Sequence, residues 1–220
     1  MSKNNLRRFV MSTIEIYIAS AVLGYFVGSI PFGLILTRMA GYGDIRKIGS
    51  GNIGATNVLR TGNKTLALLT VLLDALKAGF ASYFVGKYLP VIQSGVAENI
   101  VVWASLIAGA FGVIGHNFPV WLKFKGGKGV ASAFGFILVT SWQVALVALA
   151  IWLIMAFTFK YSSLSALVAA FFVPIISFFM GLGFPYLCVY TAVVMLVIIR
   201  HHANIKRLIN GEESKIKLKK

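Results

Sequence analysis

The residues best suited to do chemistry lie in one polar stretch at residues 44–60, DIRKIGSGNIGATNVLR. Its three glycines allow the backbone to approach another group closely, and its three basic side chains bring positive charge to the same place. Backbone amides surrounded by cations are suited to binding an anion, most often a phosphate. We therefore predict a phosphate-binding loop whose candidate residues are Gly49, Ser50, Gly51, Asn52, Gly54, Thr56, Asn57 and Arg60.

The glycines of this loop also match the pattern G-x-G-x-x-G. A dinucleotide-binding fold would need a strand before the loop and an amphipathic helix after it, and neither is indicated. Arg60 and Asn57 are three residues apart, so one helical face can present both to the same ligand. The alternative interpretation is a glycine-rich turn at the membrane surface with solvated basic side chains.

A second polar stretch runs from His116 to Lys128 and ends in the turn GGKG. A P-loop would need a glycine at position 122, which is occupied by Leu122. The turn can still offer an anion its amide groups, the dipole of a following helix and a lysine side chain. The alternative is a basic anchor on the inner leaflet. The candidate binding residues are Gly126, Gly127, Lys128 and Gly129.

The third polar stretch is RHHANIKRLINGEE at residues 200–213. His201 and Asn204 are three residues apart and can share a helical face, and Glu213 closes the stretch. A basic helix lying on anionic lipid is the alternative. Asp44 and Asp74 are the only aspartates of the chain, so we expect no aspartate-rich metal site. We also expect no metal or other cofactor.

The composition of the chain indicates the kind of fold that positions these polar stretches. The chain has 220 residues, 58% of them hydrophobic and 12% charged, and its mean hydropathy is +0.84. Soluble domains carry roughly 25% charged residues, so we predict a single membrane domain spanning residues 1–220. The formal charge is +15, and most basic residues flank apolar segments. This distribution indicates positive-inside topology and anionic partners, such as lipid headgroups or a phosphorylated substrate, and not nucleic acid.

We predict an all-α bundle of about seven spans. The segments expected to cross are about residues 13–36, 65–86, 100–115, 129–141, 143–159, 161–180 and 185–199. The three basic stretches belong in the cytoplasm, which requires an even number of crossings after the second stretch and places the N-terminus, with Arg7 and Arg8, outside. Segment 129–141 is short for a bilayer, so five spans with two re-entrant or interfacial segments is the alternative. Asp74 and Lys77 share one face of the second span, and we expect them to be paired inside the protein.

Five motifs taken together resemble the bacterial acyl-phosphate:glycerol-3-phosphate acyltransferases. They are GSIPFG at residues 28–33, the stretch at 44–60, D-x-x-K at 74–77, GHNFPVWLKFKGGKGVA at 115–131 and the stretch at 200–213. The resemblance implies a polytopic enzyme of the bacterial inner membrane with its active site on the cytoplasmic face. It would transfer a fatty acyl group from acyl phosphate to the 1-hydroxyl of glycerol 3-phosphate, giving lysophosphatidic acid and phosphate without a metal.

The same resemblance carries the functional roles onto Ser50, Arg60, Lys128, His201, Asn204 and Glu213. We expect Arg60 and Lys128 to bind phosphates, and His201 and Asn204 to orient glycerol 3-phosphate. The proton of the attacking hydroxyl goes either to His201 or to the departing phosphate, and both remain open. We further expect contact with membrane lipids, a monomer, and an association with the enzyme that produces acyl phosphate.

A transporter or flippase of a phosphorylated solute or lipid is the alternative function. It would also use basic loops and charges inside the membrane. An inverted repeat should then relate the two halves of the chain, and none is evident in the sequence.

Overall fold

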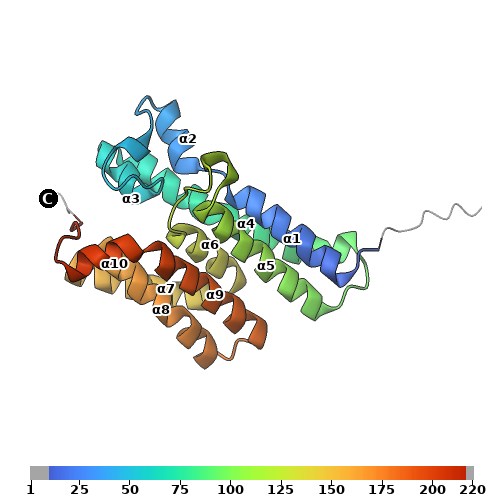
Figure 1. The fold of residues 1–220 in the computed structure, drawn as a ribbon. Coiled ribbons are helices and arrows are strands. Elements are labelled where there is room, and N and C mark those ends of the chain that lie inside the picture. Colours follow the sequence, from blue (N-terminus) through green and yellow to red (C-terminus); the bar gives the residue numbers. More distant parts are fainter. Residues whose placement is uncertain (1–9, 217–220) are drawn as a thin grey trace, which may run out of the picture.

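The computed structural model describes residues 10–216, which contain helices and no strand. Figure 1 shows a bundle of long helices with shorter ones gathered at one end. The helices are α1 (Thr13–Gly28), α2 (Phe32–Met39), α3 (Ala55–Val58), α4 (Lys64–Ile92), α5 (Glu98–Asn117), α6 (Val130–Thr140), α7 (Trp142–Phe159), α8 (Ser162–Phe179), α9 (Phe184–Arg200) and α10 (His202–Ile209). Short 3₁₀ turns lie at Ile45–Lys47, Leu59–Thr61 and Val120–Leu122.

All seven apolar segments expected from the sequence are helical, which confirms the all-α architecture. Five segments are long and apolar enough to cross a membrane, and a sixth is obtained if α9 and α10, bent by 58°, form one span. Helix α6 is apolar but has only 11 residues. The total of seven crossings and their direction stay predictions. Arg7 and Arg8 lie outside the described residues.

One expected boundary was wrong. The second span was placed at residues 65–86 with a connection after it, but α4 continues to Ile92. The side chain of Lys87 reaches back over the rings of Tyr83 and Tyr88, with its Nζ 5.3 and 5.5 Å from the ring centroids. A lysine whose aliphatic stem follows aromatic surface can be carried on a helix near a membrane boundary. The charge therefore does not end the helix.

Small residues bring the first helices into backbone contact. A Cβ atom on Gly24 or Gly28 of α1 would collide with the backbone of Ala108 or Gly112 on α5. The GxxxG spacing of α1 therefore serves close helix approach. Gly135 of α6 meets the backbone of α4 in the same way. These contacts place α1, α4, α5 and α6 in one tightly packed group.

Helices α7, α8 and α9 form the other side of the bundle and join this group through larger side chains. Phe136 of α6 and Tyr190 of α9 are fully buried and pack edge to face, 5.7 Å apart. The outward faces carry exposed apolar side chains such as Leu76, Phe80 and Phe157. A surface of this kind is compatible with lipid, not with water.

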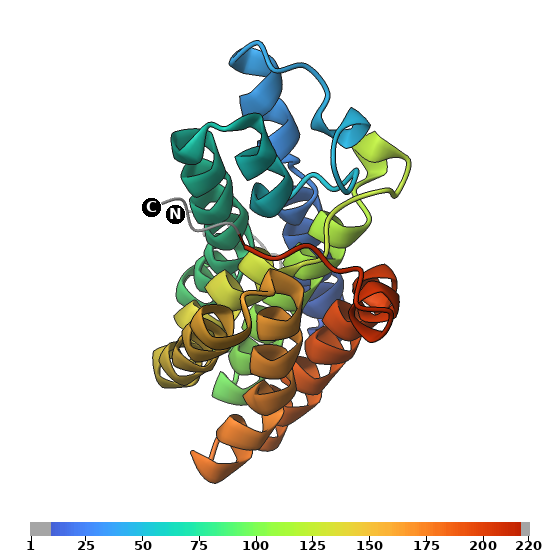
Figure 2. The same cartoon turned by 90° about the vertical axis from the view of Figure 1, so that its left-hand side faces the viewer.

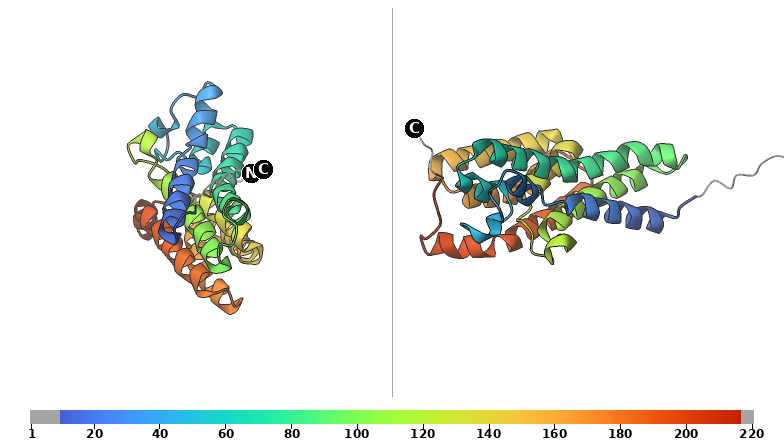
Figure 3. Two further views of the ribbon diagram at one scale, coloured as in Figure 1. Left: turned by 90° about the vertical axis from the view of Figure 1, so that its right-hand side faces the viewer. Right: turned by 90° about the horizontal axis from the view of Figure 1, so that it is seen from above.

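The three polar stretches gather at the same end of the bundle. Helix α1 stops before Pro31, and α2, the first polar stretch and α3 follow it there. Helix α10 turns away from α9 toward the same region. Figure 2 looks onto this end, and Figure 3 shows that α4 and α5 extend to the opposite one. The fold thus positions the predicted phosphate-binding residues together.

Candidate active site

The first polar stretch is held in shape by the side chain of Asn57, which is 1% exposed. Its amide nitrogen donates hydrogen bonds to the carbonyls of Ile45 at 2.7 Å, Asn52 at 2.9 Å and Ile48 at 3.2 Å. Its amide oxygen accepts a hydrogen bond from the backbone N–H of Ser50 at 3.2 Å. With these contacts made, Asn57 acts as the internal support of the loop. Its predicted contact with a ligand stays a prediction.

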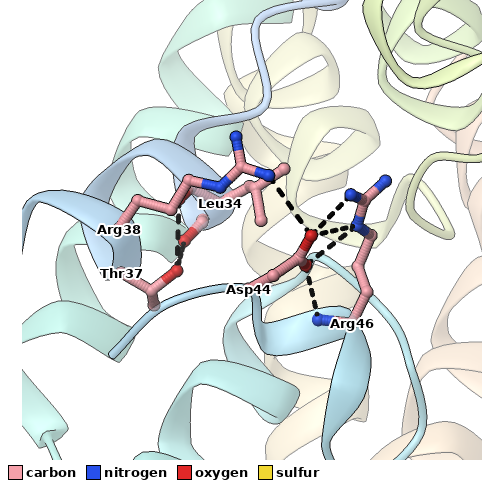
Figure 4. A network of polar contacts seen from close by, with 6 residues as sticks. Leu34, Thr37, Arg38, Asp44 and Arg46 are labelled. Atoms are coloured by element: carbon pink, nitrogen blue, oxygen red, sulfur yellow. Dashed lines mark hydrogen bonds and ion pairs between the residues drawn. The ribbon is translucent and has the colours of Figure 1, made fainter. Parts of the chain in front are cut away.

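Asp44 fixes the start of the same stretch, as Figure 4 shows. Its carboxylate accepts a hydrogen bond from the backbone N–H of Arg46 at 3.0 Å and from the Arg46 guanidinium at 2.6 Å, and forms an ion pair with Arg38 at 3.2 Å. The hydrogen bond from the Arg46 side chain, with the smaller contribution of Arg38, holds the pKa of Asp44 far below its usual range. Asp44 is therefore a structural carboxylate.

Arg60 lies against the backbone of the glycine loop and reaches the C-terminal stretch. Gly49 has a φ of 56°, and a Cβ atom there would collide with the Arg60 guanidinium and the Asn57 amide. Only glycine readily adopts this positive φ and also leaves the space free that a Cβ atom would fill. The Arg60 guanidinium donates a hydrogen bond to the hydroxyl of Ser214 at 3.3 Å. Of the other predicted loop residues, Ser50, Gly51 and Thr56 are exposed, and Asn52 and Gly54 are half-buried.

The GGKG turn is attached to the end of α5. The N–H groups of Gly126 and Gly127 donate to the carbonyls of Asn117 at 3.1 Å and His116 at 3.0 Å. These two amides are thus directed inward and are not free for an anion, contrary to what the sequence suggested. What the turn presents instead is the side chain of Lys128 and the start of α6, which has no side-chain cap and follows Gly129.

Lys128 connects the second stretch to the third. Its ammonium group donates a hydrogen bond to the side-chain oxygen of Asn204. Asn204 in turn donates to the carboxylate of Glu213 at 2.7 Å, which also accepts from Ser163 at 2.8 Å and Arg207 at 2.7 Å. Residues up to 85 positions apart in the sequence thus form one hydrogen-bonded network. Burial opposes ionisation of Glu213, but the hydrogen bonds from its three partners outweigh this and lower its pKa.

The environment of Lys128 is strongly positive. Burial lowers the pKa of its ammonium group to about 8; Glu213 acts against this shift, whereas Arg207, Arg60 and Arg200 add to it. Three arginines against one carboxylate leave net positive charge around Lys128. A bound phosphate would supply the missing negative charge.

His201 lies just beyond the end of α9 and is 2% exposed. Its Nδ1 is 2.7 Å from the carbonyl oxygen of Val197. A carbonyl only accepts hydrogen bonds, so Nδ1 carries the proton and the lone pair of the neutral ring is on Nε2. Burial lowers the pKa of His201 to about 4, opposed by the bond to Val197 and reinforced by Lys128. The ring is therefore neutral at pH 7.

Comparison with known proteins now decides the family. The family model described as glycerol-3-phosphate acyltransferase matches residues 18–211. The chain belongs to this family. A glycerol-3-phosphate acyltransferase of Mesorhizobium japonicum is 56% identical over 200 residues, which cover 90% of this chain and 95% of that protein. One of Rhodospirillum rubrum is 50% identical over 206 residues and covers 91% of both.

Solved structures agree with the glycerol-3-phosphate acyltransferase assignment. A crystal structure of PlsY, described as an integral membrane glycerol 3-phosphate acyltransferase in its glycerol 3-phosphate form, superposes with a TM-score of 0.82 and is 33% identical. The match covers 91% of this chain and 96% of that one. A lysophosphatidic acid form of PlsY gives a TM-score of 0.79 at the same identity. The family resemblance drawn from the five motifs and the integral membrane fold are thus confirmed.

Within the candidate site, the main residue not identified from the sequence is Arg200. Its guanidinium donates to the carbonyls of Gly127 at 3.1 Å and Gly126 at 3.2 Å and stacks on Phe118, 4.9 Å from the ring centroid. Its position directly before His201 was a usable signal. Ser163 and Ser214 were also missed, because their contacts join distant segments and leave no local pattern.

Asp74 and Lys77 of this acyltransferase are paired, as predicted, with 2.9 Å between Oδ1 and Nζ. Lys77 also donates to the carbonyl of Ile30 at 2.9 Å, and its Nζ lies 2.9 Å from Nδ1 of His116. All three charged or titratable side chains are buried. The cluster formed by Asp74, Lys77 and His116 is referred to below as the buried triad.

Proposed function

We propose that the chain transfers a fatty acyl group from acyl phosphate to the 1-hydroxyl of glycerol 3-phosphate, giving lysophosphatidic acid and phosphate. The observation that carries the proposal is the convergence of Arg60, Lys128 and the network of Asn204 and Glu213 at one end of the bundle. Both substrates carry a phosphate, and this site has more cations than anions. PlsY, crystallised in a glycerol 3-phosphate form, supports the choice of acceptor.

The site chemistry fits an already activated donor. Acyl phosphate is a mixed anhydride whose phosphate is a good leaving group, so the enzyme needs mainly to align the acceptor hydroxyl with the acyl carbonyl. Arg60 and Lys128 would hold phosphates and stabilise the negative charge that develops in the transition state. Ser50 and the exposed part of the glycine loop would assist them. Glu213 would act indirectly, because its carboxylate holds Asn204 and Arg207.

The route of the proton follows from the basicity of His201. A general base works best when its pKa lies near the working pH. Without bound substrate, the pKa of His201 is about 4. A phosphate monoester has a second pKa of roughly 6, and a phosphate becomes more basic still as its bond to the acyl carbon breaks, so that it leaves as hydrogen phosphate. We therefore propose that the departing phosphate takes the hydroxyl proton. His201, with its lone pair on Nε2, and Asn204 would orient glycerol 3-phosphate.

The cellular setting is part of the same proposal. We infer a single-domain, monomeric enzyme of the bacterial inner membrane with this site on the cytoplasmic face. The three basic stretches at one end support this orientation under the positive-inside rule. The acyl chain of the donor would lie among the spans, and an association with the enzyme that makes acyl phosphate would shorten the transfer.

Acyl transfer by the purified protein tests the function. Labelled glycerol 3-phosphate would be offered with palmitoyl phosphate or palmitoyl-CoA, using wild type, Arg60→Ala and the matched control Lys123→Ala. We expect lysophosphatidic acid from palmitoyl phosphate only, lost in Arg60→Ala and retained in Lys123→Ala. No product from either donor with folded wild-type protein would refute the proposed reaction.

A further inference from the structure

A second positively charged site lies beside the one described above. A cleft of about 510 Å³ opens between the first and second polar stretches. Its walls carry four cations, Arg46, Lys47, Lys125 and Arg200, and one carboxylate, Asp44. Neither Arg60 nor Lys128 lines it. The cleft is thus a second group of cations, which shares only Arg200 with the cations around Lys128.

The charge of the cleft is only partly balanced by the protein. Asp44 is bound by Arg46 at 2.6 Å and by Arg38 at 3.2 Å (Figure 4). This pairing fixes Arg46 and uses up the carboxylate. In the described part of the chain, the side chains of Lys47 and Lys125 form no hydrogen bond or ion pair, and only their backbone N–H groups are bonded, to the carbonyls of Asp44 and Leu122. The cleft therefore keeps uncompensated positive charge that an anion can neutralise.

The same backbone elements separate and connect the two cation groups. Gly51 lines the cleft, while Gly49, two residues before it, is in contact with Arg60. On the other wall, Arg200 binds the carbonyls of Gly126 and Gly127, directly before Lys128. A ligand in the cleft would therefore be next to a ligand held by Arg60 and Lys128. Such an arrangement suits a reaction between two phosphorylated molecules.

We propose that this cleft binds the phosphate group of one substrate, while the group around Arg60 and Lys128 binds the phosphate of the other. The proposal rests on the proposed function, because that reaction requires two phosphates at once. Two dianionic groups repel each other, so holding them on separate cation groups lowers the cost of bringing them together. Lys47 and Lys125 would contact the bound phosphate, and Arg46 and Arg200 would shape its site.

The double variant K47Q/K125Q tests the proposal. The side chains of these two lysines have no hydrogen-bond or ion-pair partner within residues 10–216, so the change should leave the fold intact, which its thermal unfolding temperature checks. We expect the KM of one substrate to rise about tenfold, the loss of roughly 1.4 kcal/mol of binding, with kcat within about twofold of wild type. A higher KM for glycerol 3-phosphate assigns the cleft to the acceptor, and a higher KM for palmitoyl phosphate assigns it to the donor.

The matched control is Lys123→Gln, an exposed lysine of the same turn that does not line the cleft. Its KM values should equal those of wild type. Unchanged KM values in the double variant, or equal changes in the control, would overturn the proposal. The second result would mean that general surface charge attracts the substrates or lipid.

Binding of inorganic phosphate separates this inference from the reaction itself. Calorimetry should show two binding events in wild type and one in the double variant, whether or not the protein makes lysophosphatidic acid. Identical isotherms would overturn the second phosphate site. Missing product with the expected isotherms would instead refute only the proposed reaction.

Discussion

Two charged regions of this protein differ in whether their charges are neutralised within the protein. In the buried triad, the carboxylate of Asp74 is matched by the ammonium group of Lys77, and His116 completes the cluster. At the end of the bundle, Lys128 lies among three further cations, Arg60, Arg200 and Arg207, and one carboxylate, Glu213. Charges that are compensated within the protein support the fold, whereas an excess of positive charge can be neutralised by a bound anionic ligand.

The largest effect is expected on stability, when one charge of the buried triad is removed. Asp74→Leu leaves Lys77 charged and unpaired inside the protein, which costs about 3–5 kcal/mol of unfolding free energy. Unfolding in detergent, followed by tryptophan fluorescence, measures the loss. The double variant Asp74→Leu with Lys77→Met should recover much of it. A single variant as stable as wild type would show that the triad does not support the fold.

The next effect concerns the uncompensated region. Lys128→Met removes a cation from the phosphate site, and we expect kcat/KM to fall about 100- to 1000-fold, in the range of a lost transition-state contact. The unfolding temperature should change much less than in Asp74→Leu, because removing Lys128 leaves no buried charge without a partner of opposite sign. Loss of folding instead of activity would place Lys128 with the structural charges.

A smaller effect is the pH dependence of kcat/KM that results from deprotonation of Lys128. Its pKa in the free enzyme is about 8, below the ordinary value of a lysine, so its positive charge is present below pH 8 and lost as the pH rises through that value. We expect kcat/KM to fall about tenfold per pH unit above about 8. The side chain introduced by Lys128→Arg stays charged to high pH, so this variant should shift the fall in kcat/KM to higher pH even if its overall activity is lower. If kcat/KM of this variant fell over the same pH range as wild type, the fall would be caused by titration of another group.

The smallest effect is expected at His201. If the departing phosphate takes the proton, His201→Gln retains a polar side chain at the site and should lower kcat by less than about tenfold, below the 10²–10⁴-fold contribution of a general base. Single-turnover acyl transfer measures the chemical step directly. A fall of 1000-fold or more would restore His201 as the base.

The sequence predicted the elements well because hydropathy is a property of segments. All seven apolar segments became helices, and the i, i+3 spacing of Asp74 and Lys77 correctly predicted their pairing. The third member of the triad, His116, was not found, because its contact with Lys77 joins two helices. The end of α4 was misplaced because a charged residue was taken as a helix boundary.

Within the site, the sequence indicated which stretches converge better than what each residue does. Asn57 has the residue type of a ligand contact, but its side chain is occupied inside the loop. The amides of Gly126 and Gly127 are likewise occupied by α5. Residue type and spacing show which groups can bind an anion, whereas the hydrogen bonds already made within the fold decide which groups remain available.

The glycine contacts between α1, α4, α5 and α6 have an entropic consequence. Ordering a residue with a long side chain can cost up to about 2 kcal/mol in lost rotamers, whereas glycine and alanine lose none. Helices that meet at Gly24, Gly28 and Gly135 therefore gain close contact without freezing side chains between them. The frame that holds the first two polar stretches is thus made rigid largely by residues that have almost no side-chain freedom to lose.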